Sequence, residues 1–352
     1  MKPVARPLLA WYRRHRRSLP WRESPEPYRV WISEIMLQQT QVATVLPYFD
    51  RFITRFPTVD ALAAASRQEV LAAWTGLGYY RRAEALHSAA EWIVRDNAGR
   101  FPETIEAWLK LPGIGRYTAG AILSIAFGKR FPILDGNVAR VLSRLFCVRG
   151  DPREGPTREK LWSLSTSVLP RRGVSDFNQA LMELGALVCT RKKPKCLVCP
   201  LASLCEANAR GLQEDLPELA KRKATVPVTM AAAVVRRGDK VLLYQRPSEG
   251  SMRELWELPG GTCREGEEIR DELVREAEAR YGVRLTPSEE LARVEHHIMN
   301  RRITLYAFKA RIEKEPRKVV HRRVWVGVEE VARYPMSSMT LKVLRGCDIL
   351  KA

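Results

Sequence analysis

The chain has 352 residues and a formal net charge of +19, from 59 Lys and Arg against 40 Asp and Glu. Its hydrophobic fraction of 45% excludes a wholly disordered basic protein. No apolar run approaches the ~20 residues that span a bilayer, which excludes a membrane-spanning class. A folded chain with this excess of positive charge predicts a polyanionic partner, and nucleic acid is the first candidate.

The N-terminal segment is basic and carries no acidic side chain within residues 1–22. A secretory signal needs an unbroken apolar stretch after its first charges, and arginines at 13, 14, 16 and 17 interrupt any such stretch. We therefore expect the chain to remain in a reducing cytoplasm, where clustered cysteines bind metal rather than form disulfides.

The first ~210 residues have a helical pattern of apolar positions. Runs with helical spacing cover 30–52, 61–74, 83–94, 117–127 and 138–146. Short turns with Gly, Pro or Asp separate these runs. A mostly α domain is therefore predicted for residues 1–211.

A change of character follows at 212–227, which is rich in charge and contains Pro217 and Pro227, and we interpret it as a linker. Strand-like runs then cover 228–236, 240–245 and 303–310, with one helical run at 269–281 among them. The remainder, 228–352, is predicted to be a small α+β domain.

Four cysteines lie close together in the sequence. They are separated by six, two and five residues, and they are Cys189, Cys196, Cys199 and Cys205. Sets of four cysteines hold either a tetrahedral zinc ion or an iron–sulfur cube. Zinc ribbons usually show two close pairs, whereas only one close pair is present here. The spacing favours an iron–sulfur cluster over zinc.

The segment between the first two of these cysteines contains four cations and no acid, among them Lys192 and Lys193. A cluster that fixes this short loop would hold its charges ready for phosphate groups. The alternative is an ordinary solvated basic loop.

A glycine-containing turn, LPGIG at 111–115, lies between helical runs at 104–110 and 117–127. Gly113 and Gly115 allow a tight turn that exposes backbone N–H groups, and the following helix adds its positive N-terminal end. Residues 104–127 therefore form a helix–hairpin–helix candidate that grips a DNA phosphate without reading sequence. A plain helical corner is the alternative.

An aspartate follows the next apolar run. Asp135 directly follows the apolar run 131–134 and precedes the helical run at 138–146. It either caps that helix or places a carboxylate beside the hairpin.

The chain resembles the base-excision glycosylases of the endonuclease III superfamily, and within them the adenine DNA glycosylases (MutY family). The hairpin, the loop ending in Asp135 and the cysteine spacing carry the superfamily resemblance. The family resemblance rests on LPWR at 19–22, WISEIMLQQTQV at 31–42, GLGYY at 76–80 and LWELPGG at 255–261. It covers nearly the whole chain and implies a 4Fe-4S cluster on the four cysteines.

The resemblance implies roles for four residues. Glu34 matches the general acid that protonates adenine at N7, and its apolar neighbours in the sequence would raise its pKa. Asp135 matches the aspartate that stabilises the oxocarbenium-like sugar, and Asn137 matches a polar residue that supports it. Tyr117 stands where bifunctional members carry a Schiff-base lysine, which predicts a monofunctional glycosylase. From the sequence alone, a surface position on a helix is favoured for Glu34. Tyr117 can pack between helices as well as occupy the lysine position.

Further DNA contacts are implied in the same way. Gln39 and Tyr79 match residues that wedge into the base stack, while Leu37, Gln38 and Arg22 are candidates around the adenine pocket. Wedging offsets part of the cost of extruding the base from the duplex.

The C-terminal part resembles a Nudix domain from Gly261 onward. Two metal-binding glutamates expected at 279 and 280 are replaced by Ala279 and Arg280. This change should abolish a Mg²⁺ site and with it nucleotide hydrolysis. In the family such a domain recognises 8-oxoguanine opposite the adenine. The family's Phe-Ser-His recognition triplet aligns with Ile298, Met299 and Asn300, of which Met299 lacks the hydroxyl and Asn300 remains able to bond a base.

Together these features predict a monomeric enzyme that excises adenine opposite 8-oxoguanine or guanine in duplex DNA. Three other classes remain as alternatives: an endonuclease III-like glycosylase/lyase for oxidised pyrimidines, a Nudix pyrophosphohydrolase, and a non-catalytic lesion-binding protein. Tyr117 argues against the glycosylase/lyase, and Arg280 argues against the pyrophosphohydrolase. The joint presence of Glu34 and Asp135 argues against a non-catalytic protein.

Overall fold

The computed structural model describes residues 3–220, 224–249, 252–314 and 321–350. Its residues divide by their contacts into two compact units. The first unit contains residues 1–64 and 85–221, and the second contains residues 65–84 and 222–352. The domain limits expected from sequence, at 211, 212 and 228, stay a prediction.

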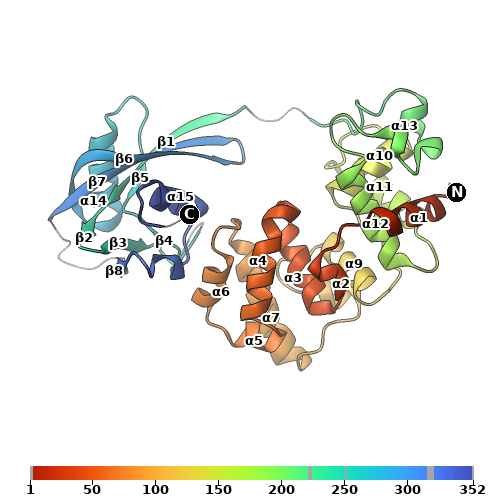
Figure 1. Cartoon of the computed structure of the whole chain (residues 1–352), viewed down its shortest axis with the longest axis horizontal. Coiled ribbons are helices and arrows are strands. Elements are labelled where there is room, and N and C mark those ends of the chain that lie inside the picture. The colour runs from red at the N-terminus through yellow and green to blue at the C-terminus, as the bar shows by residue number, and fades with distance from the viewer. Residues whose placement is uncertain (1–2, 221–223, 250–251, 315–320, 351–352) are drawn as a thin grey trace. The chain divides into compact units, whose positions relative to one another are not determined.

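The first unit is helical (Figure 1). Its helices are α1 (Ala5–His15), α2 (Pro20–Glu23), α3 (Pro27–Leu37), α4 (Val42–Arg55), α5 (Val59–Ala64), most of α7 (Arg81–Asn97), α8 (Ile105–Leu109), α9 (Arg116–Ile125), α10 (Gly136–Leu145), α11 (Gly155–Val168), α12 (Val174–Leu187) and α13 (Glu206–Ala209). Helix α3 packs against α4 and α9, while α12 packs against α1, α9 and α10. Buried aromatic rings fill part of the interior, as in the pair Trp31 and Trp108 with centroids 6.1 Å apart. Because α3, α9, α10 and α12 meet, residues distant in sequence reach one pocket.

Two helical runs predicted as continuous are each broken in the structure. The run 30–52 is interrupted between α3 and α4, where Gln39 has a φ of +59° and the amide of Thr40 bonds to Leu37 O at 3.3 Å. The run 61–74 is divided between α5 and α6 (Arg67–Trp74) by Ser66, whose side chain forms a capping box with Glu69. Apolar periodicity continues across both breaks, so it does not detect them.

The C-terminal part of the second unit contains two sheets. One has the order β5 (Gly260–Thr262), β1 (Val226–Val234), β7 (Arg301–Lys314), β6 (Arg284–Ile298), with β1 and β7 parallel. In the other, β3 (Lys240–Gln245) pairs with β2 (Arg236–Arg237), β4 (Trp256–Glu257) and β8 (Arg323–Gly327). Alternate side chains of β1 enter two separate cores, one shared with helix α15 (Ser338–Gly346) and the other with helix α14 (Ile269–Tyr281).

The predicted strand at 240–245 and the predicted helix at 269–281 are confirmed with the same limits. The long strand β6 was not predicted, because it contains Pro287 and exposes most of its first half to solvent. Such a pattern lacks the apolar alternation that marks a half-buried strand.

The predicted linker begins with a packed stretch rather than a free spacer. Leu216 is buried, and its carbonyl accepts a bond from Arg144 Nε at 2.8 Å. Glu218 accepts from the amide of Gly150 at 2.8 Å, and Asp151 accepts from the amide of Ala220 at 2.9 Å. Residues 221–223 of the predicted linker lie outside the described residues. Among the helices that the structure describes, none has the length and apolar character needed to cross a bilayer.

Candidate active site

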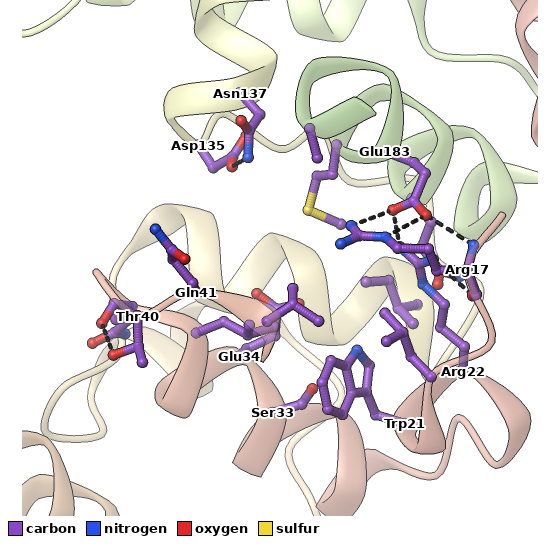
Figure 2. Close-up of a pocket in the computed structure, with 18 of the residues that line it drawn as sticks. Arg17, Trp21, Arg22, Ser33, Glu34, Thr40, Gln41, Asp135, Asn137 and Glu183 are labelled. Carbon is purple, nitrogen blue, oxygen red and sulfur yellow. Dashed lines mark hydrogen bonds and ion pairs between the residues drawn. The ribbon is translucent and has the colours of Figure 1, made fainter. Parts of the chain in front are cut away.

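One cavity of about 820 Å³ lies in the helical unit (Figure 2). Its wall includes residues of α2, α3, α9, α10 and α12. Eight of the residues singled out from sequence line it: Arg22, Glu34, Leu37, Gln38, Gln39, Tyr117, Asp135 and Asn137. The volume is within the range of pockets that enclose a small organic group.

Glu34 lies on α3 and is only 5% exposed. Its Oε2 accepts a hydrogen bond from the hydroxyl of Tyr117 at 2.7 Å. Burial raises the pKa of Glu34 to about 7, the Tyr117 bond opposes this rise, and the negative charge of Asp135 adds to it. At neutral pH a large fraction of this carboxyl group is therefore protonated.

Asp135 immediately precedes α10, and its two oxygens have different partners. Oδ1 accepts from the amide of Val138 at 2.7 Å and caps the helix, while Oδ2 accepts from Asn137 Nδ2 at 2.9 Å. Burial raises the pKa of Asp135, while these N–H donors and the charge of Arg140 lower it. The two interpretations of Asp135, helix cap and pocket carboxylate, therefore hold together. Asp135 and Asn137 lie across the pocket from Glu34 (Figure 2).

Arg140 fixes the position of Asn137. Its Nη2 donates to Asn137 Oδ1 and to the carbonyl of Gly185, both at 2.8 Å, and its Nε donates to the carbonyl of Cys189 at 2.7 Å. Gly185 also lies against Asn137: a Cβ added at Gly185 would meet the Asn137 Cβ at 2.6 Å. Helices α10 and α12 thus hold the loop at 135–137 by hydrogen bonds and by close backbone approach.

Sequence reasoning missed an ion-pair network at the same pocket. The buried Glu183 accepts from Arg17 Nη2 at 2.8 Å and from Arg22 Nη2 at 2.9 Å (Figure 2). Burial alone would raise the pKa of Glu183, but these bonds hold it at about 2. The sequence signal that could have indicated this network is Glu183 itself, a single acidic residue in the apolar C-terminal half of α12. Desolvation of Glu34 by burial outweighs the positive charge of Arg22, which acts to lower the pKa of Glu34.

The pKa of Glu34 predicts how an acid-catalysed reaction in this pocket depends on pH. If Glu34 acts as an acid, activity requires its protonated form, so the single-turnover rate should fall by about tenfold per pH unit well above pH 7. Single-turnover rates measured between pH 5 and 9 give the slope of this decline. A rate that stayed constant from pH 7 to 9 would contradict the assignment.

Two predicted wedge residues share an unusual backbone conformation. Gln39 and Tyr79 have φ values of +59° and +49°, and both are exposed. Left-handed backbone at a non-glycine residue is uncommon and concentrates at functional sites. Gln39 lines the pocket in the first unit, and Tyr79 belongs to the second unit. Leu37 lines the pocket and is partly buried.

The predicted hairpin lies between α8 and α9. Gly113 has a φ of +77°, and a Cβ there would meet the Ala85 Cβ at 2.8 Å, so a side chain is excluded at this turn. Gly115 is the N-cap of α9 and is exposed. The turn therefore presents backbone amides at a helix N-terminus, as anion binding requires.

The four clustered cysteines follow α12 and extend through two short 3₁₀ turns to α13. Arg144 Nη1 donates to Cys189 Sγ at 3.3 Å, and Cys205 Sγ donates to Arg144 O at 3.4 Å. In the part of the chain that the structure describes, no three His, Cys, Asp or Glu side chains form a group that could hold a metal ion. Four free thiols on one loop fit a larger iron–sulfur cluster. Lys192 and Lys193 lie exposed on this loop.

The predicted recognition triplet lies at the end of the β6–β7 hairpin. Ile298 ends β6, and Met299 and Asn300 connect it to β7. The Asn300 side chain donates to the carbonyl of Ala224 at 3.2 Å. This bond uses one of the two N–H donors of the amide, and the expectation that Asn300 bonds a base stays a prediction.

Arg280 stands where the resemblance to Nudix domains predicts a metal ligand. Its guanidinium donates to the carbonyl of Gly260 and to Glu257 Oε1, both at 2.7 Å. Glu257 also accepts from Arg246 Nη1, at 2.6 Å, and from the hydroxyl of Tyr281. A fixed side-chain cation thus connects α14 with β4 and β5.

Replacing this cation should loosen the sheet. In Arg280→Met, we expect the opening free energy of α14 amides to fall by about 1–3 kcal/mol, because Glu257 and Gly260 lose charge-assisted bonds. Hydrogen exchange of the full chain measures the change. Arg284→Met is the matched control, because Arg284 forms only an exposed pair with Glu313 at 3.4 Å. Equal effects in the two variants would refute the role.

Three family models match successive parts of the chain. Residues 32–166 match the HhH-GPD superfamily base excision DNA repair protein, residues 189–205 match the iron-sulfur binding domain of endonuclease III, and residues 230–346 match the NUDIX domain. The predicted fold class is confirmed. The match at 189–205 begins and ends on cysteine ligands, so the prediction of an iron–sulfur cluster rather than zinc is also confirmed.

Curated relatives extend over both units. An adenine DNA glycosylase of Homo sapiens is 35% identical and aligns with 96% of this chain and 72% of its own length. One from Buchnera aphidicola subsp. Schizaphis graminum is 46% identical over 72% of this chain and 73% of that protein. Among solved structures, a thermostable thymine-DNA glycosylase is 30% identical with a TM-score of 0.53, covering 58% of this chain and 95% of that one.

Proposed function

Because the chain belongs to the adenine DNA glycosylase family, we propose that it is a monofunctional glycosylase acting on duplex DNA. Its substrate is adenine mispaired with 8-oxoguanine or guanine, and its role is in base excision repair. The observation that carries the proposal is the pocket with protonatable Glu34 on one side and hydrogen-bonded Asp135 on the other. Two carboxyl groups in unlike environments can divide acid and charge-stabilising roles between them.

The chemistry divides into two steps. Glu34 gives its proton to N7 of the extruded adenine, which weakens the bond between the sugar C1′ and N9. As that bond breaks, positive charge grows on the sugar, and the Asp135 carboxylate stabilises it. Water then adds to C1′ and returns a proton to Glu34. The Tyr117 hydroxyl holds Glu34 in position throughout.

The absence of an amine at the pocket supports the monofunctional assignment. A lyase step needs a lysine or a terminal amine to form an imine with the sugar. Tyr117 cannot form one, and no lysine is among the described residues that line the cavity. The product is therefore an intact strand with an abasic site.

We assign sequence-independent binding of the duplex to groups that contact its phosphates. The hairpin amides at Gly113 and Gly115, together with Lys192 and Lys193, contact phosphates. When bound, the 4Fe-4S cluster joins the four thiolates and holds the basic loop in place. Gln39 and Tyr79 enter the base stack, and Arg22 and Leu37 contact the extruded adenine. The protein acts as a monomer.

The Nudix-like part is assigned to the opposite base rather than to nucleotide hydrolysis. Arg280 places a cation where a metal-dependent Nudix enzyme needs an anionic ligand. A domain of this kind without a metal site retains binding surfaces but loses the means to activate water.

Duplexes with A opposite 8-oxoguanine, G, C or T test the proposal. Strand breaks are compared before and after hot alkali, which cleaves abasic sites. We expect alkali-dependent breaks at A opposite 8-oxoguanine and G. Breaks that form without alkali would support the endonuclease III-like alternative instead.

A further inference from the structure

One buried arginine side chain lies against the segment that carries the four clustered cysteines. Arg144, in the last turn of α10, is only 2% exposed. Its Nη1 donates to Thr190 O at 2.7 Å and to Cys189 Sγ at 3.3 Å, and its Nη2 donates to Arg191 O at 3.1 Å. Its Nε donates to Leu216 O at 2.8 Å. Arg144 therefore connects α10 with the basic loop and with the packed beginning of the predicted linker.

These bonds satisfy the N–H donors of Arg144 but not its charge. A buried guanidinium group needs a negative partner, whereas carbonyl oxygens supply hydrogen bonds without a net charge. In the part of the chain that the structure describes, the recorded partners of this side chain are three carbonyls and one sulfur, and none is a carboxylate. Arg22 shows the usual arrangement, because it pairs with the buried Glu183 at 2.9 Å. Arg144 thus lacks the counter-charge that its burial requires.

Neither the helix end nor a neighbouring acid supplies this charge. The C-terminal end of α10 is partly negative, but the carbonyl partners of Arg144 lie outside α10. Glu214 follows the cysteines in the sequence, and its recorded bond is to the amide of Lys193 at 3.3 Å. Among the described residues, the ionisable group that the Arg144 guanidinium reaches is therefore the sulfur of Cys189.

We propose that Arg144 is the fixed counter-charge of the iron–sulfur cluster. Four thiolates carry more negative charge than the iron–sulfur core neutralises, so the assembled centre is an anion. The guanidinium lies against the first cysteine of the set, and the carbonyl of Arg144 lies 3.4 Å from the sulfur of the last, Cys205. The residues therefore fit a buried anion at this place. The role does not depend on the excision chemistry.

Two properties of the cluster should depend on the charge of Arg144. The first is retention, because removal of one member of a buried charge pair leaves the other uncompensated. The second is the reduction potential, which a hydrogen bond to a ligand sulfur and a nearby cation both raise, since reduction adds an electron to an anion. A side chain that only held the loop through its carbonyls would affect retention whatever its charge.

Two substitutions in the full chain separate the charge of Arg144 from its hydrogen bonds. Arg144→Lys keeps the charge and loses the planar fork, while Arg144→Gln keeps an amide donor and loses the charge. We expect Arg144→Gln to lose iron and sulfide to a chelator about tenfold faster than the parent chain, because a charge-assisted bond is removed. Arg144→Lys should recover most of this difference. Voltammetry should show a lower reduction potential in Arg144→Gln and little change in Arg144→Lys.

Arg158→Gln is the matched control, because Arg158 is exposed on α11 and the substitution changes the net charge of the chain equally. It should change neither the rate of cluster loss nor the potential. Equal rates of loss in Arg144→Lys and Arg144→Gln, or a parent-like potential in Arg144→Gln, would overturn the counter-charge.

The comparison also holds if Arg144→Gln loses its cluster during purification. The iron and sulfide contents of the purified proteins then decide: a cluster in Arg144→Lys and none in Arg144→Gln supports the counter-charge, and a cluster in neither overturns it. None of these measurements involves DNA, so failure of the proposed function, seen as no excision of adenine, is distinguishable from failure of this role.

Discussion

Replacing Glu34 by glutamine should reduce adenine excision by about 10³-fold under single-turnover conditions, because general-acid catalysis contributes on this scale. The amide keeps the size of the side chain and still accepts the Tyr117 hydroxyl, which now donates to Oε1 of the amide. It cannot transfer a proton to adenine. Binding of the mismatched duplex should change little, and stability should not fall, because a buried group that ionises with difficulty is replaced by a neutral one.

The control for this variant is Glu106→Gln, which makes the same change on the exposed face of α8. It should excise at the wild-type rate. Wild-type excision by Glu34→Gln would show that another group protonates the base, while a parallel loss of DNA binding would point to a structural role.

Replacing Asp135 by asparagine should reduce excision by about 10²-fold with only a small loss of stability. Asparagine is as good an N-cap as aspartate, so the bond from the amide of Val138 persists. The lost elements are the negative charge facing the sugar and the bond from Asn137, since two amide nitrogens cannot bond to each other. The second loss should cost about 1 kcal/mol. Single-turnover excision and urea unfolding separate the two effects.

Glu268→Gln offers a matched comparison, because Glu268 is the acidic N-cap of α14 and accepts the amide of Asp271 at 3.1 Å. Its neutralisation should leave excision unchanged. If Asp135→Asn lost several kcal/mol of stability and little catalysis, the carboxylate would be a helix cap alone.

Local structure followed well from the sequence wherever a single regular pattern decided it. Helix α14 and strand β3 have their predicted limits. The break at Ser66 depends on a capping box. The residues of a capping box can be recognised in the sequence, but the apolar periodicity across 61–74 favoured one continuous helix. Strand β6 was not predicted because its pairing with β7 sets its register, and a local sequence pattern contains no information about that contact.

The site was less accessible to pattern reasoning. Glu34 and Asp135 are far apart in sequence, and only the packing of α3, α9 and α10 brings them to one pocket. Family resemblance named both, but spacing alone did not. Glu183 was missed because its partners Arg17 and Arg22 lie at the other end of the helical unit's sequence. The partners of a long-range ion pair follow no regular spacing in the sequence, so a periodic pattern cannot predict them.

The contact between Gly185 and Asn137 bears on how inherited or engineered variants of this enzyme are judged. No substrate group is assigned to Gly185, and in an alignment it is merely one small residue in an apolar helix. Yet any side chain there would occupy the space of Asn137 and displace the loop that carries Asp135. A change to alanine, usually classed as benign within a helix, would thus resemble an active-site lesion. A ranking of variants by their distance from the reacting atoms would overlook this position. A ranking by the free space next to the loop at 135–137 would identify it.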